Sequence, residues 1–86
     1  MKITKKTVAK KLAAYLQHEL RLGDLVDWAE NAMQDCEFDL KHAKTIASVV
    51  ARIGVADVRE FGITWEDCEN MLKQLGYSAR VDIVAA

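Results

Sequence analysis

The chain has 86 residues, of which 51% are hydrophobic and 29% are charged, and this balance is typical of one folded domain. The formal net charge is -1, so no overall charge excess directs the protein to nucleic acid or to anionic lipid. Proline is absent and the four glycines are spread along the chain, which excludes collagen-like and low-complexity structure.

The first two helices are predicted from apolar residues that recur every three or four positions. A helix over 4–22 places these residues on one face: Val8, Leu12, Tyr15, Leu16 and Leu20. A second helix over 24–36 starts at Asp24 as its N-cap and buries a stripe of small and large apolar residues. That stripe comprises Leu25, Val26, Ala29, Ala32, Met33 and Cys36.

A third helix is predicted from Asp39, its N-cap, to Ile53, with an apolar arc so wide that the helix is expected to be central. The arc comprises Leu40, Ala43, Ile46, Ala47, Val49, Val50 and Ile53. A short helical piece over 56–61 and a fourth helix over 64–75 follow. Thr64 and Asp67 resemble a capping box at the start of the fourth helix. Its buried stripe is predicted to comprise Trp65, Cys68, Met71, Leu72 and Leu75.

The glycines are predicted to mark helix ends, because each follows an apolar residue that closes a helical period. The four positions are Gly23, Gly54, Gly62 and Gly76. None is then left for a phosphate-binding loop, which needs several glycines close together.

Residues 78–84 break the helical pattern, because apolar and polar residues alternate there with period two. Residues 77–86 are therefore expected to form an extended tail. Within the chain only residues 1–4 offer a strand partner. Alternatively the tail pairs with the same segment of a second copy and forms a homodimer, packs as an extended arm, or frays into solvent. The predicted fold is a single all-α domain over 1–86: a small four-helix bundle-like unit with an extra short helix and this C-terminal segment.

The apolar runs and the cysteine spacing also predict the cellular compartment of the protein. No uninterrupted apolar run follows the N-terminal lysines, and no apolar stretch is long enough to cross a bilayer, so a cytoplasmic protein without membrane contact is expected. Cys36 and Cys68 lack CxxC spacing and are predicted to be reduced and buried, with a redox pair as the alternative.

Catalytic chemistry finds no support in the residue spacing. The only histidines, His18 and His42, do not form a known zinc spacing with the cysteines. Ser48 and Ser78 lie outside any nucleophile motif. We therefore predict no catalytic residue, no metal and no cofactor, and expect the protein not to be an enzyme.

The strongest surface feature is a run of six acids without lysine or arginine between Leu22 and Leu40. N-caps and a solvated helix face would explain it, and so would a surface that binds another protein, such as a basic one. Trp28 is either a core-edge residue or an anchor ringed by acids. The leading hypothesis is an interaction module whose partner-binding residues are Asp24, Asp27, Trp28, Asn31 and Asp35.

The lysine-rich first helix supports a second hypothesis, a DNA-associated regulator that contacts phosphates through Lys5, Lys6 and Lys10. Against it, a recognition helix over 63–77 would present Glu66, Asp67 and Glu69 to the DNA, and these carboxylates would repel phosphates.

Three phrases resemble small bacterial all-α proteins: Leu12-x-x-Tyr15-Leu16, the stretch Leu25-Val26-Asp27-Trp28-Ala29-Glu30-x-Ala32-Met33, and Gly62-x-Thr64-Trp65-Glu66-Asp67-Cys68. In size and helical make-up the chain is similar to bacterial immunity proteins and antitoxins. That resemblance implies a compact helical protein that blocks a basic toxin with an acidic surface, and the Lys-rich first helix would then face away.

Overall fold

The computed structural model describes residues 2–35, 37–57 and 62–78, and it confirms a mostly helical fold. Within these residues two short strands and a 3-10 helix accompany four α-helices. In chain order the elements are β1 (Lys2–Ile3), α1 (Lys5–Leu16), α2 (Leu22–Asp35), β2 (Glu37–Phe38), η1 (Leu40–His42), α3 (Ala43–Gly54) and α4 (Trp65–Gln74).

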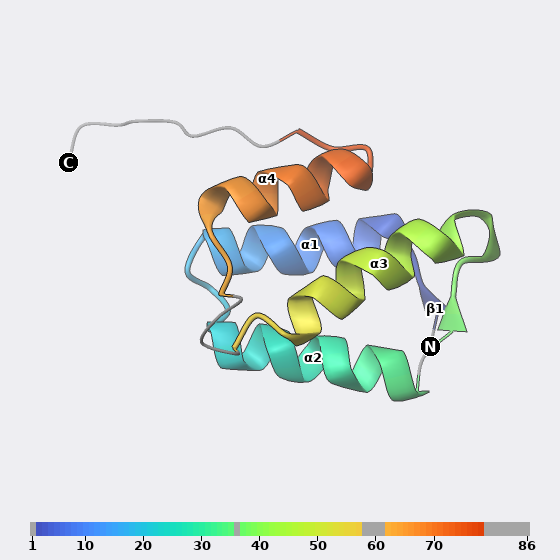
Figure 1. Ribbon diagram of the computed structural model, residues 1–86, viewed down its shortest axis with the longest axis horizontal. Helices are drawn as coiled ribbons and strands as arrows, with labels where there is room; N and C mark the ends of the chain where they lie inside the picture. Colours follow the sequence, from blue (N-terminus) through green and yellow to red (C-terminus); the bar gives the residue numbers. More distant parts are fainter. Residues whose placement is uncertain (1, 36, 58–61, 79–86) are drawn as a thin grey trace.

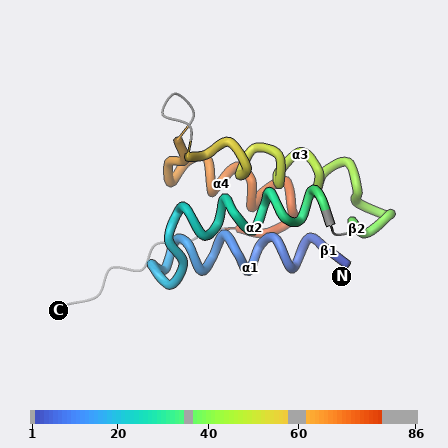
Figure 2. Tube along the Cα trace, turned by 90° about the horizontal axis from the view of Figure 1, so that it is seen from below, coloured from blue at the N-terminus to red at the C-terminus, as the bar shows by residue number. Residues whose placement is uncertain are grey.

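Consecutive helices run in opposite directions, so that α1 and α3 point one way and α2 and α4 the other (Figure 1). The helix contact between α2 and α3 is the most extensive, and Figure 2 shows these two helices side by side. Helix α1 packs against both α2 and α4. As its wide apolar arc predicts, α3 is central, and Ile46, Val49, Val50 and Ile53 are all buried in the core.

The chain's N-terminal segment is held by a small parallel sheet, which the sequence analysis did not predict. Lys2 pairs with Glu37 and Ile3 with Phe38, and the Asp39 N–H donates a 2.8 Å hydrogen bond to the Ile3 carbonyl. Burial of the Ile3 side chain in the core holds β1 in this position. Strand β1 therefore pairs with the segment that follows α2. Of the strand predicted over 78–84, all residues after Ser78 lie outside the described part of the chain.

Helix α1 is shorter than predicted and ends at Leu16, not at residue 22. Its end is a Schellman motif with His18 in the left-handed position at φ 62°. Two hydrogen bonds close the motif, from the His18 N–H to the Tyr15 carbonyl at 3.1 Å and from the Glu19 N–H to the Ala14 carbonyl at 2.9 Å. Because histidine rather than glycine takes this position, the glycine pattern missed the helix end.

Only some of the glycines have the predicted role. Gly76 takes φ 88° after α4, and the Tyr77 N–H donates to the Leu72 carbonyl at 2.8 Å, which confirms the predicted helix end. Gly23 instead lies inside the first turn of α2, so its prediction was wrong, and Gly54 is the last residue of α3. Gly62 has φ 49°. The short helix that was predicted before it, over 56–61, is not seen at residues 55–57, which form a turn, and residues 58–61 lie outside the described part of the chain.

Three side chains predicted to be buried are exposed. Leu40 is 90% exposed because it starts the 3-10 turn before α3 instead of the helix itself. Met33, in the last turn of α2, is 53% exposed. Trp65, the first residue of α4, is 39% exposed because the hollow beside it is not filled by another described element.

Candidate interaction surfaces

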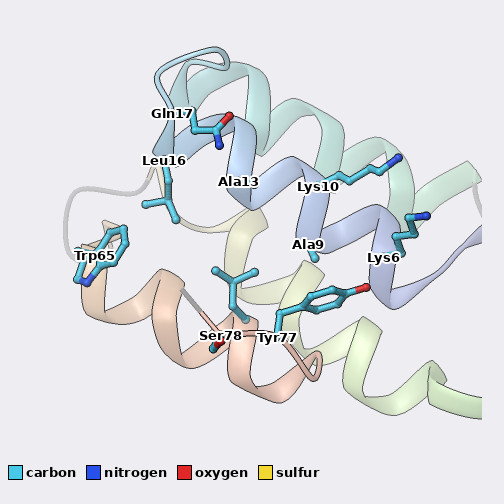
Figure 3. Close-up of a pocket in the computed structure, with 10 residues that line it drawn as sticks. Lys6, Ala9, Lys10, Ala13, Leu16, Gln17, Trp65, Tyr77 and Ser78 are labelled. Carbon is cyan, nitrogen blue, oxygen red and sulfur yellow. The ribbon is translucent and has the colours of Figure 1, made fainter. Parts of the chain in front are cut away.

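A groove of about 560 Å³ lies between α1 and α4 (Figure 3). We call it the α1–α4 groove. Its lining comprises Lys6, Ala9, Lys10, Ala13, Leu16 and Gln17 from α1 and its end, Trp65 and Leu72 from α4, and Tyr77 and Ser78 after it. Most of the lining is apolar, which is typical of a surface that binds another molecule.

Two residues on the α1 side of the groove are small. Ala9 and Ala13 lie one turn apart on the same face of α1. Their side chains fill little space between the helices, and Leu72 of α4 forms the facing wall. The distance between two packed helices depends on the side chains at the contact, so small side chains here let another helix approach α1 closely.

An aromatic side chain stands at each end of the groove, and local backbone structure fixes both. Trp65 is 39% exposed and follows the N-cap Thr64. Tyr77 is 43% exposed and follows Gly76, whose left-handed turn directs the chain back toward α1. Figure 3 shows the Tyr77 ring near the Lys6 end of α1 and Trp65 near Leu16 and Gln17.

A second hollow, of about 520 Å³, continues the apolar surface beyond Trp65. Both hollows are lined by Leu16 and Trp65, so the tryptophan stands between them. The other lining residues come from the α1–α2 turn and from the segment before α4: Tyr15, His18, Leu20, Arg21, Leu22, Ile63 and Thr64. Exposed aromatic residues between two depressions are typical of the energetic centre of a protein interface.

The charged side chains of this surface are basic along α1. Lys6 and Lys10 line the groove, and Arg21 lines the second hollow. None of the described residues that line either hollow is acidic. The α4 residues of the described lining, Trp65 and Leu72, are uncharged, so the charge of the groove comes from its α1 edge.

The predicted acidic surface lies on the outer side of α2, where Asp24, Asp27 and Asn31 are exposed. The Arg21 Nε–H donates a 3.3 Å hydrogen bond to the Asp24 carboxylate, and the two side chains form an ion pair. Asp35 is the last residue of α2, and its side chain is outside the described part of the structure. The exposed Met33 lies on the same helix, so an apolar side chain accompanies the acids.

Trp28 takes the core-edge position that was one of its two sequence interpretations. It is half-buried, packs against the hydrophobic core, and has the Lys11 Nζ 5.8 Å from its ring centroid. This cation–π contact places a lysine beside the ring, so that less of Trp28 than of Trp65 is available to a partner.

The three lysines of the DNA hypothesis separate into two environments. Lys6 and Lys10 are exposed and border the apolar groove. Lys5 is half-buried and reaches the end of α4, since its Nζ lies 3.8 Å from the position that a Cβ on Gly76 would occupy. Only two of the three are therefore available together on one face.

The described titratable groups with shifted pKa values serve structure. The Thr64 backbone N–H donates a 2.9 Å hydrogen bond to Asp67 and lowers the pKa of that carboxyl, and the Thr64 side chain and Arg52 lower it further. Arg52 also donates a 2.9 Å hydrogen bond to the Gly62 carbonyl. Burial raises the pKa of the Cys68 thiol to about 11, which leaves it protonated at neutral pH.

Among the described residues, no group of three or more histidine, cysteine, aspartate or glutamate side chains is arranged to hold a metal ion. The helices in the described ranges are all too short or too polar to cross a bilayer. Comparison with known protein families, curated proteins and solved structures finds no match to this chain.

Sequence reasoning missed the α1–α4 groove. It placed Leu16 on the apolar face of the first helix and Trp65 in a buried stripe, and it expected Tyr77 to pack back on the last turn of the fourth helix. Two signals were available, because Tyr77 directly follows a glycine helix end and Ala9 and Ala13 are spaced by one turn. The pairing of α1 with α4, on which the groove depends, has no signature in the local sequence.

Proposed function

We propose that the chain is a non-enzymatic protein-interaction module, a small bundle of helices that binds a partner protein through the α1–α4 groove. The observation that carries the proposal is the exposure of Trp65 and Tyr77 at the two ends of an apolar groove. Large exposed aromatics cost free energy in water, and in binding proteins they are the residues that supply most of the affinity.

A protein partner suits this surface better than a reacting substrate does. The groove is open, and its described lining holds two lysines but no carboxylate, cysteine or histidine. The two described groups with shifted pKa values, Asp67 and Cys68, have structural causes for their shifts and do not line the groove. General acid–base or nucleophilic chemistry would need such groups within reach of the bound molecule.

The acidic surface of α2 is a second candidate for the binding site. Met33 favours it, because this side chain is exposed on a helix whose outer face carries Asp27 and Glu30. A basic partner would fit this face by charge, as the resemblance to immunity proteins and antitoxins implies. Trp28 is partly buried against the core and less exposed than Trp65, so this face has a smaller aromatic anchor than the groove has.

Site-specific photo-cross-linking in cells of the source organism tests the proposal. A benzoyl-phenylalanine side chain replaces Trp65 in the groove, Asp27 on the acidic face, or Lys44 on the exposed side of α3. We expect a discrete adduct with one protein from position 65. Ala13→Glu should abolish that adduct because it places a charge on the groove floor, whereas Ala51→Glu, an exposed change on α3, should preserve it.

The three positions separate the possible results. An adduct from position 27 but not from position 65 would assign binding to the acidic face and reject the groove. Adducts of equal strength from all three positions would indicate non-specific contact. If no position yields an adduct while circular dichroism shows that the variants are helical, the proposed function is wrong.

A further inference from the structure

We infer that the occupant of the α1–α4 groove is an amphipathic helix of the partner protein, with acidic side chains along the edge that lies beside α1. This inference rests on the proposed function, since it specifies the partner segment that the same groove binds. It depends on three features: the helical walls of the groove, its small floor residues and its basic edge.

The walls favour a helix over an extended segment. Most of the groove lining belongs to α1 and α4, whose interior backbone N–H and C=O groups are already paired within each helix. The groove therefore offers no strand edge with which an extended peptide could form a ladder. A helix satisfies its own backbone groups and needs to present only side chains to the groove.

The floor and the two ends set the size of this helix. From Lys6 to Leu16 the axis of α1 rises about 15 Å, so about three turns of a partner helix would lie along the groove. Ala9 and Ala13 leave room for a leucine or phenylalanine of that helix to contact Leu72. Trp65 and Tyr77 would then cover the two ends of its apolar face.

The basic α1 edge of the groove determines which polar residues the partner helix should carry. Lys6 and Lys10 are exposed and four positions apart, so both lie on the same side of α1. Acids four positions apart on a helix alongside α1 would lie at the same spacing and could pair with both lysines. Helix α4 contributes only the uncharged Trp65 and Leu72 to the described lining, so its side of the groove favours neither sign of charge.

Two segments of this chain fit less well than such a partner. In residues 79–86 the alternation of apolar and polar residues extends only over 79–83, and Asp82 is the single acid, so they lack two acids at helical spacing. Helix α2 of a second copy is acidic and amphipathic, but its apolar stripe, which includes Leu25, Ala29 and Ala32, is already buried in its own core. Neither can present an apolar stripe and paired acids together.

Binding of designed peptides to the full chain tests the inference. In a Trp28→Phe background Trp65 is the sole tryptophan, and its emission reports on the groove. The first probe is a side-chain-stapled 12-residue helix with a leucine stripe and two glutamates four apart. The second replaces the glutamates with lysines, the third rearranges the first with period-two alternation, and the fourth is the peptide of residues 79–86.

We expect the acidic helix alone to shift the Trp65 emission to the blue with saturation. Lys6→Glu with Lys10→Glu should weaken its binding about tenfold, because each ion pair becomes a repulsion. Lys41→Glu with Lys44→Glu makes the same change in net charge outside the groove and should alter binding less than about twofold.

Tighter binding of the lysine helix, the period-two peptide or the 79–86 peptide would overturn the inference and leave the groove as the binding site. Emission that shifts with protein concentration alone, with dimers in sedimentation, would assign the groove to a second copy and also overturn it. If no peptide shifts the emission, the inference is wrong, and the adduct from position 65 decides separately whether the proposed function holds.

Discussion

Asp67 shows how one carboxylate links a helix end to the rest of the molecule. Its Oδ2 accepts the Thr64 N–H at 2.9 Å, and its own N–H donates to the Thr64 hydroxyl at 3.1 Å. The same carboxylate oxygen lies 3.3 Å from Arg52 of α3. The sequence predicted the capping box from the residue spacing, but the ion pair to Arg52 required the packing of α3 against α4.

The lowered pKa of Asp67 predicts an acid-dependent loss of stability. A carboxylate whose pKa is lower in the folded state stabilises the fold above the unfolded-state pKa, and this contribution disappears as the pH falls through the folded value. Asp67→Asn should therefore lower the melting temperature at pH 7, and the difference from the wild type should shrink as the pH falls below about 4. Thermal unfolding between pH 2 and 7 measures it.

Asp57→Asn, at an exposed turn residue, is the matched control and should change the melting temperature little at any pH. A difference between Asp67→Asn and the wild type that stays constant down to pH 2 would contradict the assigned role of the Asp67 charge.

Helix ends differ in how visible they are in the sequence. The end of α4 at Gly76 was predicted, because glycine adopts the left-handed conformation at no steric cost. The end of α1 was not, because His18 takes that conformation despite its side chain. The segment that follows turns the chain so that Leu20 can pack against the core, and this packing favours the turn over continuation of the helix.

His18→Gly should stabilise the protein by about 1 kcal/mol, because it removes the steric cost of the left-handed conformation. The matched control is Gln17→Gly, since Gln17 has φ -87° and gains nothing from glycine. That control should be neutral or destabilising by about 0.5–1 kcal/mol. Urea unfolding at pH 7 measures both variants, and equal effects of the two changes would contradict the explanation of the helix end.

At the scale of the whole molecule, the core depends on α3. Ile53 is fully buried at the end of α3 and belongs to the cluster to which all four helices contribute. A chain of this length has a total stability of only about 4–13 kcal/mol. Loss of one core side chain can therefore unfold a large fraction of the molecules.

Ile53→Ala is expected to lower the free energy of unfolding by about 2–5 kcal/mol, because it removes buried methyl groups and leaves a cavity. Val55→Ala, two residues on and 37% exposed, should cost much less, on the order of 0.5 kcal/mol. Chemical denaturation followed by circular dichroism compares them. Similar losses for both variants would indicate that α3 is not central to the core in solution.

The α1–α4 groove also belongs to the whole molecule, because helices at opposite ends of the chain form it. Small alanine side chains of α1 line it on one side, and its aromatic ends come from Trp65 at the start of α4 and Tyr77 just after its end. No single element contains the surface that we propose as the binding site.

The sequence by itself determined the helical class, the central place of α3, the capping box of α4 and the glycine end at Gly76, because each depends on residues within one or two turns of one another. Only the tertiary structure decided the β1–β2 pair, the end of α1 at His18, the exposure of Trp65 and the groove. These features depend on which elements become neighbours, and burial energy shared among distant residues selects those neighbours.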